Sequence, residues 1–266
     1  MYTHTARAVG VLIAATVALG LAGCASAAPE APQTPTATQE DLEGSITVFA
    51  AASLKGTFAE LAEQFEAANP ETTVELNFAG SADLVTQITE GAPADVFASA
   101  DEKSMAKLTD ADLVDGEPVD FATNVLEIAV PPTNPAAIET FDDLAAPGVK
   151  LVICAPEVPC GAATVTLEQA SGVTLSPVSE ESSVTDVLGK VLSGEADAGL
   201  VYVTDVIAAG DAVDGIEFDE SAEAVNTYPI AAVTDADASD VAAAFVAFVT
   251  GEAGRAVLTA AGFGLP

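Results

Sequence analysis

The sequence is poor in histidine and in basic residues, and both shortages limit what the protein can do. It has one histidine, His4, and seven Lys and Arg residues against 41 Asp and Glu residues, for a formal net charge of −34. His4 lies in a segment that reads as an export signal, so the exported chain has no histidine as general base or metal ligand. This excludes most hydrolase and zinc chemistry. So acidic a surface also repels nucleic acid and anionic lipid headgroups, and we expect neither as a partner.

Cysteine is scarce as well, with only Cys24, Cys154 and Cys160. Beyond the signal, Cys154 and Cys160 are an even pair in an exported protein, which favours a disulfide across a short loop. The alternative is a transition-metal site, for which two thiolates without histidine are a poor ligand set.

Residues 1–23 have the pattern of a lipoprotein signal peptide. Arg7 precedes a largely apolar run, Ala8 to Leu21, that is too short for a comfortable membrane span. The run ends in Leu-Ala-Gly before Cys24, which resembles a bacterial lipobox. Cys24 would then be the lipidated first residue of a chain anchored to the outer face of the cell membrane; the alternative is a free buried cysteine ending a membrane anchor. Residues 24–43 are largely Ala, Pro, Thr, Ser and Gln and are expected to form a flexible tether.

The remaining residues alternate between short apolar runs and helical periodicity. Strands are predicted at 45–50, 74–78, 95–98, 125–130, 149–154, 199–203 and 228–233, and helices at 54–68, 84–88, 103–108, 161–170, 184–192 and 240–250. Strands that alternate with helices indicate an α/β protein with parallel sheets. The length suits two lobes better than one barrel, and ligands of such folds bind at the carboxyl ends of strands.

Two serines follow predicted strands and precede predicted helices. Ser53 comes after the first strand, at the expected N-cap of the first helix, and Ser81 follows Gly80 after the second strand, as the expected cap of the next helix. Serine is a good helix N-cap and needs no ligand to explain it. The same turn, however, points backbone N–H groups and the positive helix end outward, which makes a site for an anion.

Four segments together resemble the periplasmic molybdate-binding proteins of ABC-type molybdate transporters, over about residues 46–263; they are Ile46 to Leu54, Phe78 to Ser81, Gly91 to Asp101 and Gly199 to Tyr202. The resemblance implies a type II periplasmic binding protein fold with a ligand cleft between two lobes. Lobe I would comprise residues 44–123 and 226–266, and lobe II residues 124–225.

By position, the resemblance implies that the oxyanion is bound by the hydroxyls of Ser53, Ser81 and Tyr202 and by the N–H groups of Cys160 and Val184. The loop before Cys160 is one residue shorter than in the family. A disulfide between Cys154 and Cys160 would stiffen the loop that presents the N–H of Cys160. Alternatively, it would only stabilise lobe II, with no role in binding. The N–H of Val184 could be an ordinary first-turn donor, and Tyr202 an ordinary core residue.

These inferences predict a monomeric solute-binding lipoprotein without cofactor or turnover, which captures molybdate, and also tungstate, and delivers it to an ABC permease. Within the same class, the ligand could be sulfate, another oxyanion or a small organic anion. An enzyme using Asp95, Asp101 or Asp205 would lack a histidine or cysteine partner. A divalent-cation binder would need a run of acids at calcium-loop spacing, which the sequence does not contain.

Overall fold

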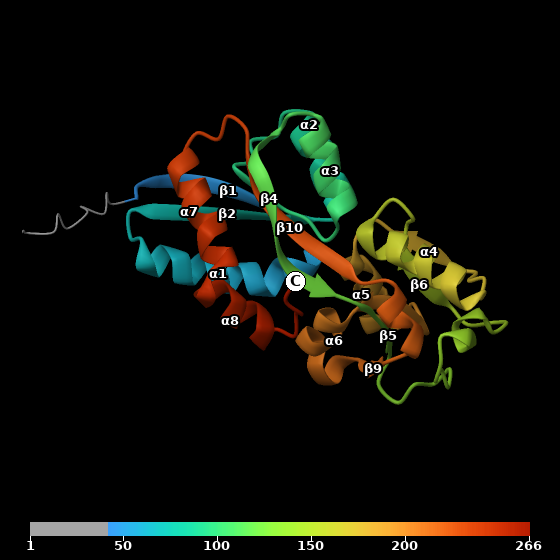
Figure 1. Cartoon of the computed structure of the whole chain (residues 1–266). Helices are drawn as coiled ribbons and strands as arrows, with labels where there is room; N and C mark the ends of the chain where they lie inside the picture. Colours follow the sequence, from blue (N-terminus) through green and yellow to red (C-terminus); the bar gives the residue numbers. More distant parts are fainter. Residues whose placement is uncertain (1–41) are drawn as a thin grey trace, which may run out of the picture. The chain divides into compact units, whose positions relative to one another are not determined.

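The computed structural model describes residues 42–266 and builds them around two five-stranded sheets (Figure 1). The strand order is β2-β1-β3-β10-β4 in one sheet and β7-β6-β8-β5-β9 in the other. The predicted signal peptide, the lipidation of Cys24 and all but the last two residues of the predicted tether lie outside the described residues.

Lobe I consists of the first sheet with its helices. Its strands are β1 (Gly44–Ala51), β2 (Thr72–Ala79), β3 (Val96–Ala98), β4 (Val114–Asn124) and β10 (Asn226–Val233). Its helices are the 3-10 turn η1 (Ala52–Leu54), α1 (Lys55–Ala68), α2 (Ser81–Thr89), α3 (Glu102–Asp110), α7 (Ser239–Thr250) and α8 (Glu252–Ala260). Buried side chains of α1, α7 and α8 form one apolar layer with the sheet and those of α2 and α3 form another, so the sheet is covered on both faces.

Lobe II is the second sheet with its helices, and it has a core of its own. Its strands are β5 (Leu126–Val130), β6 (Leu151–Cys154), β7 (Ser179–Glu181), β8 (Ala198–Tyr202) and β9 (Asp214–Ile216). Its helices are α4 (Pro159–Ser171), α5 (Val184–Leu192) and α6 (Val203–Ala209), with 3-10 turns at Asp142–Ala145, Gly210–Ala212 and Asp219–Glu223.

The prediction of parallel sheets is wrong for part of each sheet. Strands β1, β2 and β3 are parallel, as are β6, β7 and β8, but β10 is antiparallel to β3 and β4, and β5 is antiparallel to β8 and β9. The chain leaves lobe I along β4, with only Val125 between β4 and β5, and re-enters it along β10. Because the outgoing and returning strands pair, with Asn124 opposite Asn226, they run in opposite directions.

Aromatic side chains join the helices to the sheet in lobe I. Phe58 and Phe65 of α1 meet Phe245 of α7 with ring centroids 6.2 and 5.3 Å apart, and Phe121 of β4 meets Tyr228 of β10 at 6.2 Å. All five are at most 2% exposed. Each such burial contributes about 1.5–3 kcal/mol, so this cluster holds the strands that lead to lobe II in a fixed place.

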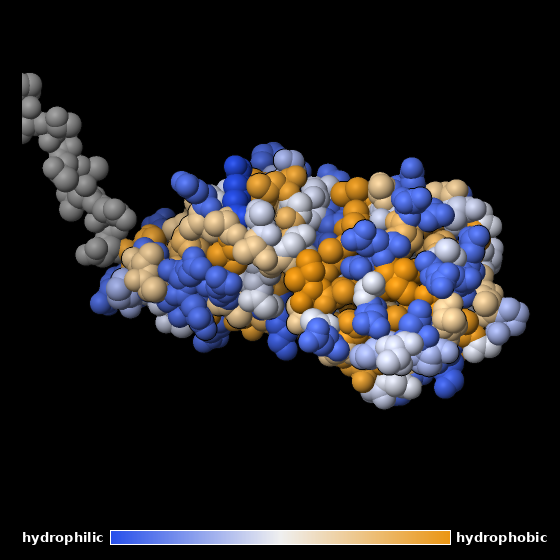
Figure 2. Space-filling model, turned by 90° about the horizontal axis from the view of Figure 1, so that it is seen from below, coloured by the Kyte–Doolittle hydropathy of each residue, from blue (hydrophilic) through white to orange (hydrophobic). Residues whose placement is uncertain are grey.

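On the surface of residues 42–266, the exposed large apolar side chains are Val119, Val178, Leu192, Ile207, Val225 and Leu265. Figure 2 shows one face, on which hydrophobic residues gather near the middle and hydrophilic residues are spread over the rest. In residues 42–266, no single helix has the length and apolar character to cross a membrane. Only α7 and α8 taken together, bent by 55° at Gly251, match a span in length and composition.

Candidate functional site

A small cavity lies where the carboxyl ends of strands from both lobes meet. It is about 10 Å³ in volume and is lined by Ala51, Ala52, Ser53, Gly80, Ser81, Ala100, Val158, Pro159, Cys160, Val184 and Tyr202. The first six residues come at or after the ends of β1, β2 and β3, and the other five at or after the ends of β6, β7 and β8. The structure therefore brings together all five residues that the sequence proposed for the ligand. A cavity of this volume holds about one water molecule.

Ser53 lies inside the 3-10 turn η1 and is not the helix cap that the sequence predicted. The residue before η1 is Ala51, and α1 begins only at Lys55, so a tight turn separates the strand from the helix. The side chain of Ser53 is consequently not turned toward the helix backbone. Its Oγ lies 3.1 Å from the hydroxyl of Tyr228 on β10.

Ser81 is likewise not an N-cap. Gly80 occupies the cap position of α2, and Ser81 is the first helical residue, with 1% of its surface exposed. The Oγ of Ser81 accepts a hydrogen bond from the N–H of Ala100 at 3.0 Å, and the carbonyl of Ala100 accepts one from Asn226 Nδ2 at 2.9 Å. Three segments far apart in the chain thus fix the position of Ser81.

Cys160 and Val184 each lie in the first turn of a helix, α4 and α5 respectively. First-turn N–H groups have no acceptor within their own helix. Within residues 42–266, neither of these two N–H groups donates to another backbone or side-chain acceptor, which leaves both free for the cavity. Cys160 is joined to Cys154 by a disulfide, with Cα atoms 5.7 Å apart, so the loop between β6 and α4 is closed covalently.

Tyr202 ends β8 and is 1% exposed. Its hydroxyl is buried and has no hydrogen-bond partner among the described residues, although such groups are normally paired. Burial raises the pKa of this hydroxyl well above its usual value, so it remains a donor. The backbone N–H of Tyr202 donates to Asp205 Oδ2 at 3.0 Å, and this bond holds the backbone of Tyr202 in place.

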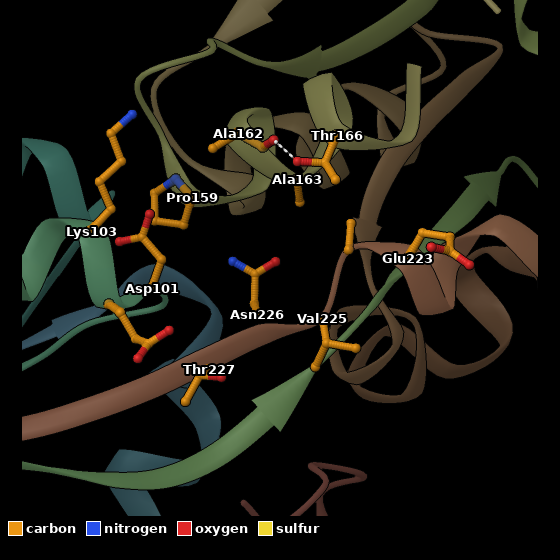
Figure 3. A pocket seen from close by; sticks show the side chains of 12 residues that line it. Asp101, Lys103, Pro159, Ala162, Ala163, Thr166, Glu223, Val225, Asn226 and Thr227 are labelled. Atoms are coloured by element: carbon orange, nitrogen blue, oxygen red, sulfur yellow. Dashed lines mark hydrogen bonds between the residues drawn. The ribbon is translucent and has the colours of Figure 1, made fainter. Parts of the chain in front are cut away.

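Charged side chains line a neighbouring cavity instead. That larger cavity, about 300 Å³ in volume, shares Pro159 with the small one and is lined also by Asp101, Glu102, Lys103 and Glu223. In Figure 3 the amide of Asn226 lies among these residues, with Asp101 and Pro159 to one side. No charged residue lines the small cavity, and no cluster of His, Cys, Asp or Glu in the described part of the chain could hold a metal ion. The small cavity therefore offers neutral hydrogen-bond donors.

Three residues that shape the site were not identified from the sequence. Tyr228 is hydrogen-bonded to Ser53 across 175 residues of chain, and Ala100 to Ser81 across 19. Asn226 acts on Ser81 indirectly, through its bond to the carbonyl of Ala100 across 126 residues. A strand was predicted around Tyr228, but nothing in its spacing indicated that its hydroxyl would reach Ser53.

A small cavity enclosed by two α/β lobes, each contributing strand ends and helix N-termini, defines a two-lobed solute-binding protein. The chain belongs to the bacterial extracellular solute-binding protein family, whose model matches residues 46–264. It is 47% identical over 256 residues to the molybdate-binding protein of Mycobacterium tuberculosis strain H37Rv, covering 96% of this chain and 97% of that one.

Two further comparisons agree with this assignment. The molybdate-binding protein of Escherichia coli strain K12 is 34% identical over 206 residues, covering 72% of this chain and 78% of that one. The structure of the Azotobacter vinelandii periplasmic molybdate-binding protein superposes with a TM-score of 0.73 at 25% identity, covering 83% of this chain and 99% of that one. The predicted α/β periplasmic binding protein fold is confirmed.

Proposed function

We propose that the protein captures molybdate, and also tungstate, outside the cytoplasm and delivers it to an ABC permease. The observation that carries this proposal is the hydroxyl of Tyr202, which is buried at the cavity without a partner. An oxyanion oxygen would supply the missing acceptor. Ser53, Ser81 and the N–H groups of Cys160 and Val184 would supply the other donors.

Neutral donors are sufficient to hold a dianion. A hydrogen bond to a charged acceptor contributes about 1.5–3 kcal/mol. Five such donors would together supply about 8–15 kcal/mol. After the cost of ordering the ligand and the lobes, about 8–12 kcal/mol would remain, which corresponds to a dissociation constant between micromolar and nanomolar. The absence of lining charges thus favours many aligned donors over ion pairing as the source of affinity.

The site would select its ligand by protonation and by size. A cavity that presents only donors pairs well with molybdate, tungstate or sulfate, which are fully ionised near neutral pH. Hydrogen phosphate carries a proton that needs an acceptor, and leaving it unpaired costs about 1–3 kcal/mol. Discrimination against the smaller sulfate would come from donors spaced for molybdate, because sulfate would then leave some of them unpaired.

The remaining parts of the proposal concern how the protein is held and what it serves. The lipobox-like segment supports anchoring through a lipid on Cys24, which would keep the binding lobes beside the permease. We expect the protein to act as a monomer that releases its ligand unchanged. No turnover is expected, because the residues around the small cavity include no acid, base or nucleophile pair.

Calorimetric titration of the purified protein with molybdate, tungstate, sulfate and phosphate tests the proposed function. We expect tight binding of molybdate and tungstate, weaker binding of sulfate, and a loss of at least tenfold in molybdate affinity in Ser53→Ala and in Ser81→Ala. Ser193→Ala, an exposed serine at the end of α5, is the matched control and should leave the affinity unchanged. Absence of binding to all four oxyanions would rule out this function.

A further inference from the structure

Tyr228 does not line the small cavity, yet it contacts a residue that does. Its side chain is completely buried, in edge-to-face contact with the rings of Phe121, Tyr202 and Phe263. Its hydroxyl has one hydrogen-bond partner among the described residues, the Oγ of Ser53 at 3.1 Å. Heavy-atom positions alone leave open which of the two hydroxyls donates.

The surroundings of Tyr228 decide the direction of this bond. The other polar neighbours of the Tyr228 hydroxyl are the Tyr202 hydroxyl and the Asn124 side chain. Asn124 Oδ1 already accepts from the N–H of Val125, and the Tyr202 hydroxyl forms no hydrogen bond among the described residues. If Ser53 were the donor, the hydrogen of the Tyr228 hydroxyl would therefore lack a well-placed acceptor, at a cost of about 1–3 kcal/mol. If Tyr228 is the donor, both its hydrogen and one lone pair of Ser53 are satisfied, and the hydrogen of Ser53 is free to point into the cavity. Burial raises the pKa of Tyr228 well above its usual value, so the phenol keeps the hydrogen it donates.

Ser81 is arranged in the same way by a different group. Its Oγ accepts the N–H of Ala100, a group that can only donate, so the hydrogen of Ser81 is also free for the cavity. With Tyr228 as the donor, each of the two serines accepts one hydrogen bond from the protein and has its own hydrogen available for the cavity.

We propose that Tyr228 is a positioning residue that commits the hydroxyl of Ser53 to donating, and that it thereby disfavours oxyanions which carry a proton. This inference rests on the proposed function, and it assigns part of the ligand selectivity to a residue that does not touch the ligand. A protonated oxyanion needs an acceptor in the cavity. Tyr228 occupies one of the two lone pairs of Ser53 and fixes the rotation of its hydroxyl so that the hydrogen, and not the oxygen, faces the cavity. Removing the phenolic hydroxyl would release that lone pair and let Ser53 rotate.

Tyr228→Phe tests the proposal, because it removes the hydroxyl and retains the buried ring. Molybdate and hydrogen phosphate affinities are measured by calorimetry for the wild type, Tyr228→Phe, Ser53→Ala and the double variant. A second pair, Ser81→Ala with and without Tyr228→Phe, is the matched control. Thermal melting of each ligand-free variant establishes that it is folded.

We expect Tyr228→Phe to weaken molybdate binding about five- to tenfold and to lower the ratio of molybdate to phosphate affinity. In the Ser53→Ala background the same change should cause no further loss, because Tyr228 acts through Ser53, whereas in the Ser81→Ala background it should cause its full loss. An unchanged molybdate affinity, an unchanged affinity ratio, or an equal loss in both backgrounds would overturn the proposal. Failure of the wild type to bind molybdate would instead refute the proposed function.

Discussion

At the scale of single residues, the hydroxyl of Tyr202 lacks a hydrogen-bond acceptor until a ligand binds, and this costs free energy. This hydroxyl is buried and unpaired, and an unpaired buried donor costs about 1–3 kcal/mol. Tyr202→Phe should therefore raise the unfolding free energy of the ligand-free protein by up to about 1 kcal/mol, the full gain being reached only when the lobes close without ligand. It should also weaken molybdate binding about tenfold, since one donor is lost. Urea denaturation and calorimetry measure the two effects; a loss of both stability and affinity would show that the hydroxyl has a structural role.

The buried carboxyl of Asp205, which accepts a hydrogen bond from the N–H of Tyr202, makes the stability of the fold depend on pH. Burial raises the pKa of this carboxyl from 3.8 to about 7, although the N–H of Tyr202 lowers it in part. Between these pH values the folded protein retains a proton that the unfolded chain has released. The stability contributed by this group is therefore complete below pH 3.8 and is lost as the pH rises to about 7.

Asp205→Asn isolates this effect, because the amide oxygen can still accept from Tyr202 and does not titrate. Relative to the wild type, the variant should gain stability between pH 4.5 and 7, by at most about 1.4 kcal/mol per pH unit, and the difference should level off above that range. Urea denaturation of both proteins over this pH range measures the difference in unfolding free energy. The contributions of the surface acids cancel in this difference, because both proteins contain them. A difference that does not change with pH would contradict the assignment.

The residues of the site could be found from the sequence only in part. Ser53, Ser81 and Tyr202 were identified because they follow strands and match a family pattern, and the structure brings them to one cavity. Their local roles were predicted wrongly for both serines, since neither is a helix cap. Tyr228 was missed because its contribution depends on a contact across 175 residues, and periodicity carries no information about such contacts.

At the scale of elements, the loop between β6 and α4 is closed by the disulfide from Cys154 to Cys160, six residues apart. Closing so short a loop stabilises the fold by about 2 kcal/mol through the entropy of the unfolded chain. Replacing both cysteines by alanine should lower the unfolding free energy by that amount. It should also weaken molybdate binding several-fold, because the loop presents the N–H of Cys160. Unchanged affinity with reduced stability would mean that the disulfide only stabilises lobe II and does not contribute to binding.

Element prediction succeeded where an apolar run or a helical stripe was bounded by clear turn residues. The strand at 45–50 and the helix that Asn69 and Pro70 end are both confirmed. Strand β4 was missed because it is an edge strand with many exposed acids and with Gly116 and Pro118 inside it. Helix α6 begins at Val203, which was predicted as strand, since an apolar run does not show where a buried strand ends.

At the scale of the whole molecule, two lobes that meet around a cavity must approach one another closely, and the clearest contact is at Gly80. A Cβ at this position would clash with the carbonyl oxygen of Ser182 in lobe II. The backbone of Gly80, with φ −60° and ψ 140°, is one that alanine adopts readily. Glycine is thus required here by the neighbouring lobe and not by the local turn.

Gly80→Ala should therefore separate folding from closure. Each lobe can fold as before, because no atom of lobe I obstructs a new methyl group as the Ser182 carbonyl does. We expect the melting temperature without ligand to stay the same or rise slightly, since alanine restricts the unfolded chain. Molybdate affinity should fall at least tenfold, because the donors of lobe II can no longer reach an ion held by Ser53 and Ser81. Small-angle X-ray scattering should show that molybdate compacts the wild type and not the variant.

Gly56→Ala is the matched control, since a Cβ at Gly56 in α1 meets nothing within 4 Å. It should slightly raise stability, as alanine favours a helix over glycine by about 1 kcal/mol, and leave both affinity and compaction unchanged. If Gly80→Ala bound and compacted like this control, the cavity would not depend on the lobes closing, and its donors would have to act from lobe I alone. Because Cys160, Val184 and Tyr202 all belong to lobe II, we expect the two variants to differ.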